Sequence, residues 1–268
     1  MGTSTDYKSP SGTNWRGHKS RVTNAASSGT NDSKKLEKVV GSFLAAAGSP
    51  TAAATGPGTG AGSGGSGGGG SRSGGGRSGG GSRGGVGGRA GRSAARRLGS
   101  FAYSVGSQGL ATALQDLGLG SLIGSSAEAI QDALIDVLCE DGGLLDEGDA
   151  RQAMDDSLIE LLDGAQTYQE VENALNNTLS AANLRDVLYR FFGNYIYRQL
   201  VRHHYERLLR AQGQQSTEDF FQEVKSTISS SISEFVSNNP APILNWNTTD
   251  VDGFITQVQQ DIFDIFQA

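Results

Sequence analysis

The segment LRDVLYRFFGNYIYRQLVRHHYERLLRA, residues 184–211, decides the fold class of this chain. Its pattern predicts one long helix, the longest and the most aromatic in the sequence. The aromatic residues lie around more than one face of this helix, which indicates a core contact on one side and leaves room for a partner on another. They are Tyr189, Phe191, Phe192, Tyr195, Tyr197 and Tyr205.

Further helices are predicted on both sides of this segment. Residues 93–118 indicate a helix that is broken or kinked near Gly106, and Asn238 to Pro242 form a clear break. No run of alternating β-branched residues competes, so residues 98–268 are predicted to be an all-α domain of six to eight helices. The expected helix starts are Ser125 with Glu128, Asp146, Thr167 with Glu170, Ser216 or Thr217, and Thr249 with Asp252.

The N-terminal part of the chain has a different character. Residues 1–30 are polar and show no helical or strand period, so we expect a disordered arm that orders only on a partner. Within residues 31–48, the sequence SKKLEKVVGSFLAAA has the apolar period of a helix, with Asp32 or Ser33 at its start and Gly48 at its end. One short helix is not stable alone in water, so it must dock on the C-terminal domain or on a partner.

Residues 49–97 are predicted to be a flexible linker. Residues 56–92 contain 21 glycines in 37 positions, together with serine and arginine. Glycine loses much backbone entropy on ordering, and this stretch buries almost nothing in return. A linker of about 50 residues spans roughly 40 Å, which predicts that the arm reaches well away from the domain.

Charge is distributed unevenly along the chain. Residues 1–110 contain fourteen Lys and Arg and three acids, a net charge of +11, and the remainder has a net charge of −17. Arginines in the linker can contact nucleic-acid phosphates weakly, but residues 56–92 contain no aromatic residue for base stacking. We therefore favour a solvated tether and keep nucleic acid as the weaker interpretation. These arginines are Arg72, Arg77, Arg83, Arg89, Arg92, Arg96 and Arg97.

The sequence contains no credible active site. His203 and His204 are adjacent, so they point about 100° apart on a helix and suit a surface or interface role better than metal binding. Asp155, Asp156, Glu160 and Asp163 fit solvated helix faces. No phosphate-binding loop or nucleophile motif is present. We predict a protein that is not an enzyme and that uses no metal or cofactor.

Two further features of the sequence indicate the cellular compartment of the protein. The single cysteine, Cys139, lies in an apolar helical run, where a buried and inert thiol is expected. The chain has no apolar run of membrane-spanning length and no secretory signal pattern at its N-terminus. These observations predict a cytoplasmic protein without membrane contact.

The N-terminus offers one reactive group. Methionine before a small residue is normally removed, which would leave the α-amine of Gly2 exposed and partly neutral at cellular pH. The myristoylation pattern fails, because the sixth residue is Asp6 and not Ser or Thr. From chemistry alone an ordinary chain end remains the default reading, with a modified Gly2 as the alternative.

The order of segments resembles a known family. The start MGTSTDYKSP is followed by NW, by LEKVVGSFLAAAG, by the glycine-rich tether and then by LGSFAYSVGSQGLATALQDLGLGSLIGSSAEAIQDALIDVLCEDGGLLDEGDARQAM. This order closely resembles the QatB family, the B components of the four-gene Qat anti-phage defence systems of bacteria. The resemblance covers essentially the whole chain and is strongest at residues 1–17 and 98–154.

The resemblance implies partners and a role for the N-terminus. Qat systems also encode an ATPase, a QueC-like enzyme and a TatD-like nuclease. QueC enzymes activate a 7-deazaguanine carboxylate with ATP, so the family implies that the amine of Gly2 is joined to that carboxylate as an amide. It further implies that Thr3, Ser4 and Thr5 lie extended in the enzyme's channel. Candidate anchors outside the channel are Tyr7, Pro10 and Trp15.

A second hypothesis belongs to a different functional class. The basic first half of the chain would hold phage nucleic acid, and the acidic helical domain would recruit the nuclease. This adaptor model predicts an affinity for DNA that falls steeply with salt and that depends on the linker arginines.

Overall fold

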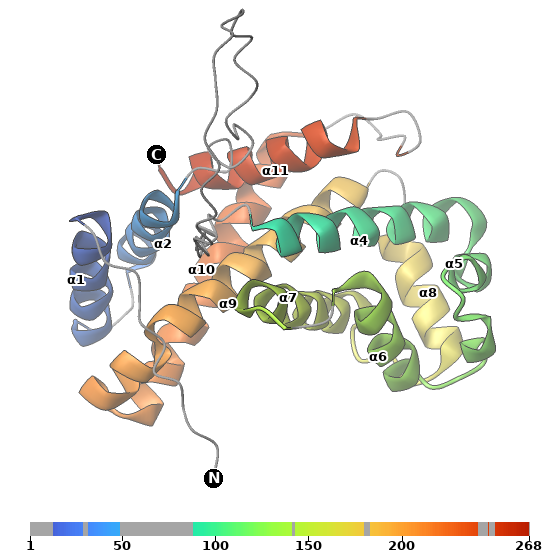
Figure 1. Ribbon diagram of the computed structural model, residues 1–268, viewed down its shortest axis with the longest axis horizontal. Helices are drawn as coiled ribbons and strands as arrows, with labels where there is room; N and C mark the ends of the chain where they lie inside the picture. The colour runs from blue at the N-terminus through green and yellow to red at the C-terminus, as the bar shows by residue number, and fades with distance from the viewer. Residues whose placement is uncertain are drawn as a thin grey trace, which may run out of the picture.

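Helix α9, Leu184–Gln212, is the axis of the molecule in a computed structural model of the chain (Figure 1). The structure describes residues 13–28, 32–48, 88–140, 143–179, 183–240, 246 and 250–267. All regular structure in these ranges is helical, which confirms the all-α prediction. Besides α9, the elements are α1 (Thr13–Ser27), α2 (Ser33–Ala47), α4 (Arg89–Gln108), α5 (Leu110–Asp116), the 3-10 helix η1 (Gly120–Leu122), α6 (Ala127–Leu138), α7 (Leu145–Leu162), α8 (Tyr168–Thr178), α10 (Gln214–Asn238) and α11 (Val251–Ile265).

Helix α9 is buried on several sides because four other helices of the domain pack along it. It contacts α7 and α10 most extensively and also meets α4 and α11. The rings of Tyr189, Phe191, Phe192 and Tyr195 are buried, as expected for the core side of the aromatic segment. At Gly193 an added Cβ would lie 2.8 Å from Ile232 Cδ1, so this glycine allows α10 to approach α9 closely.

The remaining helices of the domain gather around α4 and α7. Helix α4 lies across α7 and α9, while α5, α6 and α8 gather beyond the end of α7 (Figure 1). The break after α4 falls at Gly109, whose φ is 86°, and not near Gly106. Glycine adopts this left-handed conformation without the penalty that a side chain would add.

Helix starts agree with the sequence to within a few residues. Thr167 and Glu170 form the predicted capping box of α8. The α6 cap is Ser126 and not Ser125, and Ser126 Oγ accepts a hydrogen bond from Ala129 N. Three other starts also differ: α7 begins after Leu144, α10 begins after Gly213, and Asp250 caps α11. The sequence pattern locates a helix more reliably than it locates the first residue of that helix, because neighbouring polar residues compete for the capping position.

The largest difference from expectation is helix α1. Residues 1–30 were expected to lack secondary structure, but Thr13–Ser27 form a helix that packs beside α2 (Figure 1). We call α1 and α2 together the N-terminal hairpin. Its inward positions on α1 include His18, Val22 and Ala25. This weakly apolar stripe gives little periodic signal, and contacts with the rest of the fold stabilise the helix instead.

The linker boundary also differs from expectation. Helix α4 begins at Arg89, so the last nine residues of the predicted linker, 89–97, are helical. Residues 49–87 lie outside the described residues. No described helix combines the length and apolar character needed to cross a membrane.

Candidate functional site at the docked N-terminal hairpin

The residues predicted to meet a partner enzyme divide at the start of helix α1. Gly2, Thr3, Ser4, Thr5, Tyr7 and Pro10 lie outside the described residues, and Trp15 lies in the first turn of α1. The Trp15 ring centroid is 5.9 Å from that of Phe43 on α2 and 5.0 Å from that of His203 on α9. The indole is half-buried, so Trp15 fastens α1 to two other helices and presents only part of its ring to a partner.

Two histidines form the polar centre of the hairpin contact. His18 of α1 and His204 of α9 are each only 1% exposed, and their Nε2 atoms lie 2.7 Å apart. On its other side, His18 Nδ1 lies 2.8 Å from Ser42 Oγ of α2. One imidazole therefore joins three helices that are distant in the sequence.

The hydrogen bonds determine which ring nitrogen carries each proton. The Ser42 hydroxyl donates to Val39 O, so Ser42 Oγ can only accept from His18, and the His18 proton lies on Nδ1. His18 Nε2 is then an acceptor, and His204 Nε2–H donates to it. This leaves His204 Nδ1 without a proton, buried and without a hydrogen-bond partner among the described residues.

Burial keeps these imidazoles neutral. Burial, reinforced by the nearby charge of Arg207, lowers the pKa of His18 to about 4. Burial also lowers the pKa of His204 to about 2 and that of His203 to about 3. Of the surface or interface role predicted for His203 and His204, the surface alternative does not hold for His204, which is buried under α1.

Other contacts extend the hairpin interface toward α10 and the end of α11. Arg207 Nη2 donates to Lys19 O at 3.0 Å, and Ser231 Oγ donates to Glu37 Oε1 at 3.2 Å. Gly41 allows the closest approach, because a Cβ there would lie 2.0 Å from Phe266 O. The hairpin is thus seated on α9, on α10 and on the residues that follow α11.

This arrangement changes the role expected for the glycine-rich segment. Residues 49–87 connect α2 to α4, and the structure docks both helices on the same domain. While the hairpin is docked, the reach of the N-terminal residues is set by the segment before Thr13. The earlier expectation, in which the linker alone sets that reach, does not hold for the docked state.

The linker arginines that the structure describes belong to helix α4. Arg96 pairs with Asp252, while Arg97 donates to Val137 O at 3.3 Å and to Cys139 O at 3.4 Å. The structure gives no ion pair to Arg89 or Arg92 among the described residues. Arg72, Arg77 and Arg83 lie outside the described residues. Two of the predicted nucleic-acid contacts therefore have structural partners within the protein.

Helix α7 carries acids that are not solvated, contrary to the sequence-based interpretation. Asp156 is 8% exposed, and its two oxygens accept from Arg198 Nε at 2.6 Å and Nη2 at 2.7 Å. Lys225 Nζ of α10 lies 3.5 Å from the same carboxylate. Glu160 and Asp163 are exposed as predicted, and Asp155 is half-buried. Asp156 thus joins α7, α9 and α10.

Two more acids of α7 serve its packing. Asp149 lies 2.6 Å from Arg202, and burial raises the pKa of Asp149 to about 6 although that arginine lowers it. Asp146, predicted to cap the helix, instead accepts hydrogen bonds from Tyr195 Oη and from Ala90 N at the start of α4. These carboxylates have structural partners and do not form an acid–base pair in a cleft.

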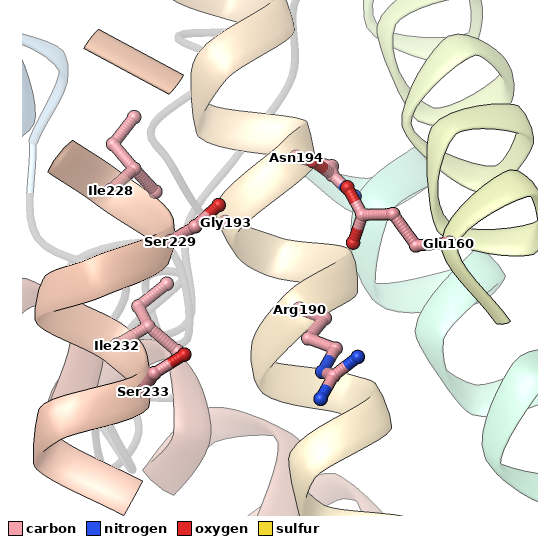
Figure 2. Close-up of a pocket in the computed structure, with 8 residues that line it drawn as sticks. All are labelled: Glu160, Arg190, Gly193, Asn194, Ile228, Ser229, Ile232 and Ser233. Atoms are coloured by element: carbon pink, nitrogen blue, oxygen red, sulfur yellow. The ribbon is translucent and has the colours of Figure 1, made fainter. Parts of the chain in front are cut away.

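A groove of about 320 Å³ runs between α9 and α10 (Figure 2). Arg190 and Glu160 extend on one side of it, and Ile228 and Ile232 lie on the other. The side-chain amide of Asn194, which lines the groove, is already engaged. Asn194 Nδ2 donates to Ser157 Oγ at 3.1 Å and to Glu160 Oε1 at 3.4 Å. The groove offers a mixed contact surface and no assembled set of catalytic groups.

The described residues contain no cluster of three or more His, Cys, Asp or Glu side chains placed to bind a metal. Cys139 is buried as expected, and burial raises the pKa of its thiol to about 11. The sequence-based analysis missed His18 entirely. Its signal was weak but present, since His18, Val22 and Ala25 recur at spacings of four and three.

Comparison with known proteins places this architecture in a family. A family model described as "Qat anti-phage system associated protein QatB" matches residues 75–266. No curated protein and no solved structure matches the chain. The matched residues contain every helix from α4 to α11 and leave out α1 and α2. Since the match covers more than half of the chain, this protein belongs to the QatB family of Qat anti-phage systems.

Proposed function

We propose that this protein is a non-enzymatic component of its Qat system and serves as a protein substrate. In this proposal Met1 is removed and the α-amine of Gly2 is joined to a 7-deazaguanine by the QueC-like enzyme of the system. The helical domain docks the partner proteins of the same system, among which the family resemblance includes the ATPase and the TatD-like nuclease. The protein acts in the cytoplasm.

The observation that carries the proposal is the anchoring of helix α1. From Trp15 onward the chain is fixed to α2 and α9, and its polar first residues precede this fixed base. Eleven residues, 2–12, span at most about 40 Å when extended. That length is sufficient to enter a deep channel in another protein while the domain stays outside.

The chemical step balances as an amide condensation. ATP activates the carboxylate of the deazaguanine as an acyl-adenylate, and the neutral Gly2 amine attacks the acyl carbon and displaces AMP. One C–N bond forms, the acyl–oxygen bond to AMP breaks, and the amine loses one proton to solvent. Glycine suits this step because it has no side chain to hinder the attack.

The sequence that follows Gly2 fits a narrow channel. Thr3, Ser4 and Thr5 are small and polar, and Tyr7 and Pro10 are the next bulky residues. In the proposal, Tyr7 and Pro10 contact the rim of the enzyme, together with the exposed part of Trp15. Replacing Ser4 with Trp therefore blocks conjugation, whereas Ser4→Ala preserves it.

The intact mass of the protein co-expressed with its neighbouring genes tests the proposal. The expected product lacks methionine and carries the mass of the carboxy-deazaguanine less one water. Gly2→Ala keeps a primary amine and is the matched control for Gly2→Pro, which presents a hindered secondary amine. Loss of methionine alone, together with intact phage defence by the Gly2→Pro variant, would refute the proposal.

The nucleic-acid adaptor is the second candidate, and the structure supports it less. Arg96 and Arg97 are engaged within the protein, which leaves the adaptor with Arg89, Arg92 and the arginines before α4. A variant with Arg72, Arg77 and Arg83 changed to Ser separates the two functions. The adaptor requires this variant to lose salt-sensitive DNA binding and defence, whereas the substrate model expects its conjugation to continue.

A further inference from the structure

The N-terminal hairpin has the properties of a separate unit seated on the domain. It lies outside the residues matched by the family model, while the α9 and α10 surface beneath it lies inside them. A long segment, residues 49–87, separates it from α4 in the sequence. The hairpin also buries a continuous apolar face in the common core, consisting of Leu36, Val39, Val40, Phe43 and Leu44.

Charge pairing does not hold the hairpin in place. Five of its basic side chains are exposed, and the structure gives none of them an ion pair among the described residues. These residues are Arg16, Arg21, Lys34, Lys35 and Lys38. The contacts with the domain are instead apolar packing, a few single hydrogen bonds and the buried His18–His204 pair.

The histidine pair has no well-partnered position for an additional proton. A proton added to His18 Nε2 would face the Nε2–H of His204, and the two donors would repel. A proton added to His204 Nδ1 would keep the hydrogen bond between the rings, but the new N–H would be buried without an acceptor among the described residues. Either route leaves a positive charge inside a closed interface.

The surroundings of the pair make that charge more costly. The groups that act on the two rings from α1 are Lys19 and Arg21, and those from α9 are His203 and Arg207. None of them is an acid. Helix α2 contributes Ser42 and the ring of Phe43, and no charge from α2 or α10 is among those that act on the pair.

We propose that α9, α10 and the end of α11 form a receptor surface whose ligand is the chain's own hairpin, and that the hairpin docks and releases as a unit. Docking requires both His18 and His204 to be neutral, so acidification releases the hairpin. Release adds the hairpin and residues 49–87 to the reach of the N-terminus and uncovers the apolar receptor surface. This inference does not depend on any modification of Gly2.

The expected size of the effect follows from proton linkage. In the released hairpin each imidazole has an ordinary pKa near 6.5, and docking lowers it. The released state therefore binds protons first, and docking weakens as the pH falls below about 6.5. Between pH 7.5 and 5.5 each of these two histidines weakens docking by about tenfold, so the pair weakens it by about a hundredfold. His203, which lies beside Trp15 and Phe43 of the hairpin, adds to this loss.

The test uses the full chain, folded before it is cut. A specific protease site is placed within residues 60–70, and the purified protein is cleaved in that segment without denaturant. Binding of the released N-terminal fragment to the remaining chain is then measured between pH 7.5 and 5.5, while circular dichroism follows the helical content of each sample. We expect a stable complex at pH 7.5 and a dissociation constant about a hundredfold higher at pH 5.5.

Three results would overturn the inference. The fragment could fail to bind at pH 7.5, it could bind equally well at both pH values, or the helices of the domain could unfold in the same step as release. Ser231→Ala is the matched control, because it removes one hydrogen bond of the hairpin without removing a titrating group. It is expected to retain the hundredfold pH response.

Discussion

Helix α9 uses two opposite means of holding its neighbours. Along its middle, the half-buried Arg198 meets the buried Asp156 of α7 in a doubly hydrogen-bonded ion pair. One to two turns further on, His204 meets His18 of α1 as a pair of neutral rings. Removing one partner of such a charged pair leaves the other charge uncompensated, whereas neutral imidazoles form a contact that a proton can break.

The two interfaces consequently respond to acid with opposite signs. Asp149 has a pKa raised to about 6 in the folded protein, so lowering the pH toward its ordinary value near 3.8 favours the folded state. His204 has a pKa lowered to about 2, so lowering the pH below its ordinary value near 6.5 favours the released state. Mild acid is therefore expected to loosen the hairpin before it loosens α7.

The largest effect is expected from Asp156→Ala. The change leaves Arg198 and Lys225 partly buried without their carboxylate, and breaking a buried pair in this way costs about 3–5 kcal/mol. Unfolding of the full chain in urea measures the loss. Asp155→Ala is the matched control on the same helix, since it removes only the hydrogen bond from Gln131 Nε2 and is expected to cost about 1 kcal/mol. Equal losses in the two variants would contradict the distinction drawn between the interfaces.

A pair of glycine substitutions is expected to have the next largest effect, confined to the hairpin. In Gly41→Ala the new Cβ would lie 2.0 Å from Phe266 O, a backbone atom that cannot rotate away, so we expect docking to weaken by about 2–3 kcal/mol. Gly17→Ala, on α1, meets no atom within 4 Å and should stabilise the helix by about 0.5–1 kcal/mol. Hydrogen exchange of the α1 amides measures both changes.

The comparison also shows which structural levels the sequence could predict. Helix α9 and the capping box of Thr167 and Glu170 were predictable, because their signals lie within one helix. The burial of Asp156 was not, since its partner Arg198 is 42 residues away and nothing local distinguishes this acid from exposed Glu160. The sequence pattern of a helix gives the period of its apolar residues, but it does not give the charge of the side chains that pack against that helix from elsewhere in the chain.

Helix α1 and the candidate site were hidden for a related reason. The inward side of α1 is formed by a histidine, a valine and an alanine, and its stability comes from α2 and α9 rather than from its own propensity. His18 gains its role only where the fold brings it to Ser42 and His204. The role of the N-terminal glycine stays a prediction from the family resemblance, because Gly2 lies outside the described residues.

His18→Phe is expected to have a smaller effect and tests the neutral pair directly. Phenylalanine retains an aromatic ring beside Trp15 and Phe43 but removes both hydrogen bonds and one titrating group. We expect docking at pH 7.5 to weaken by about 1–2 kcal/mol, because the His204 Nε2–H loses its acceptor. Its pH response between 7.5 and 5.5 should also fall by about tenfold. Exchange rates of the α1 amides, corrected for intrinsic pH dependence, test this, and an unchanged response would locate the proton elsewhere.

The smallest effect is expected from Ser231→Ala at the edge of the hairpin. Ser231 Oγ donates to Glu37 Oε1 in a half-buried position, so its loss should weaken docking by about 0.5–1 kcal/mol. Glu37 can then turn toward water, so no buried charge is left unpaired and the pH response should match that of the parent chain. Exchange of the α1 amides at two pH values separates the two quantities. A reduced pH response in Ser231→Ala would mean that Glu37 takes part in the titration, and the assignment of the acid response to the two histidines would fail.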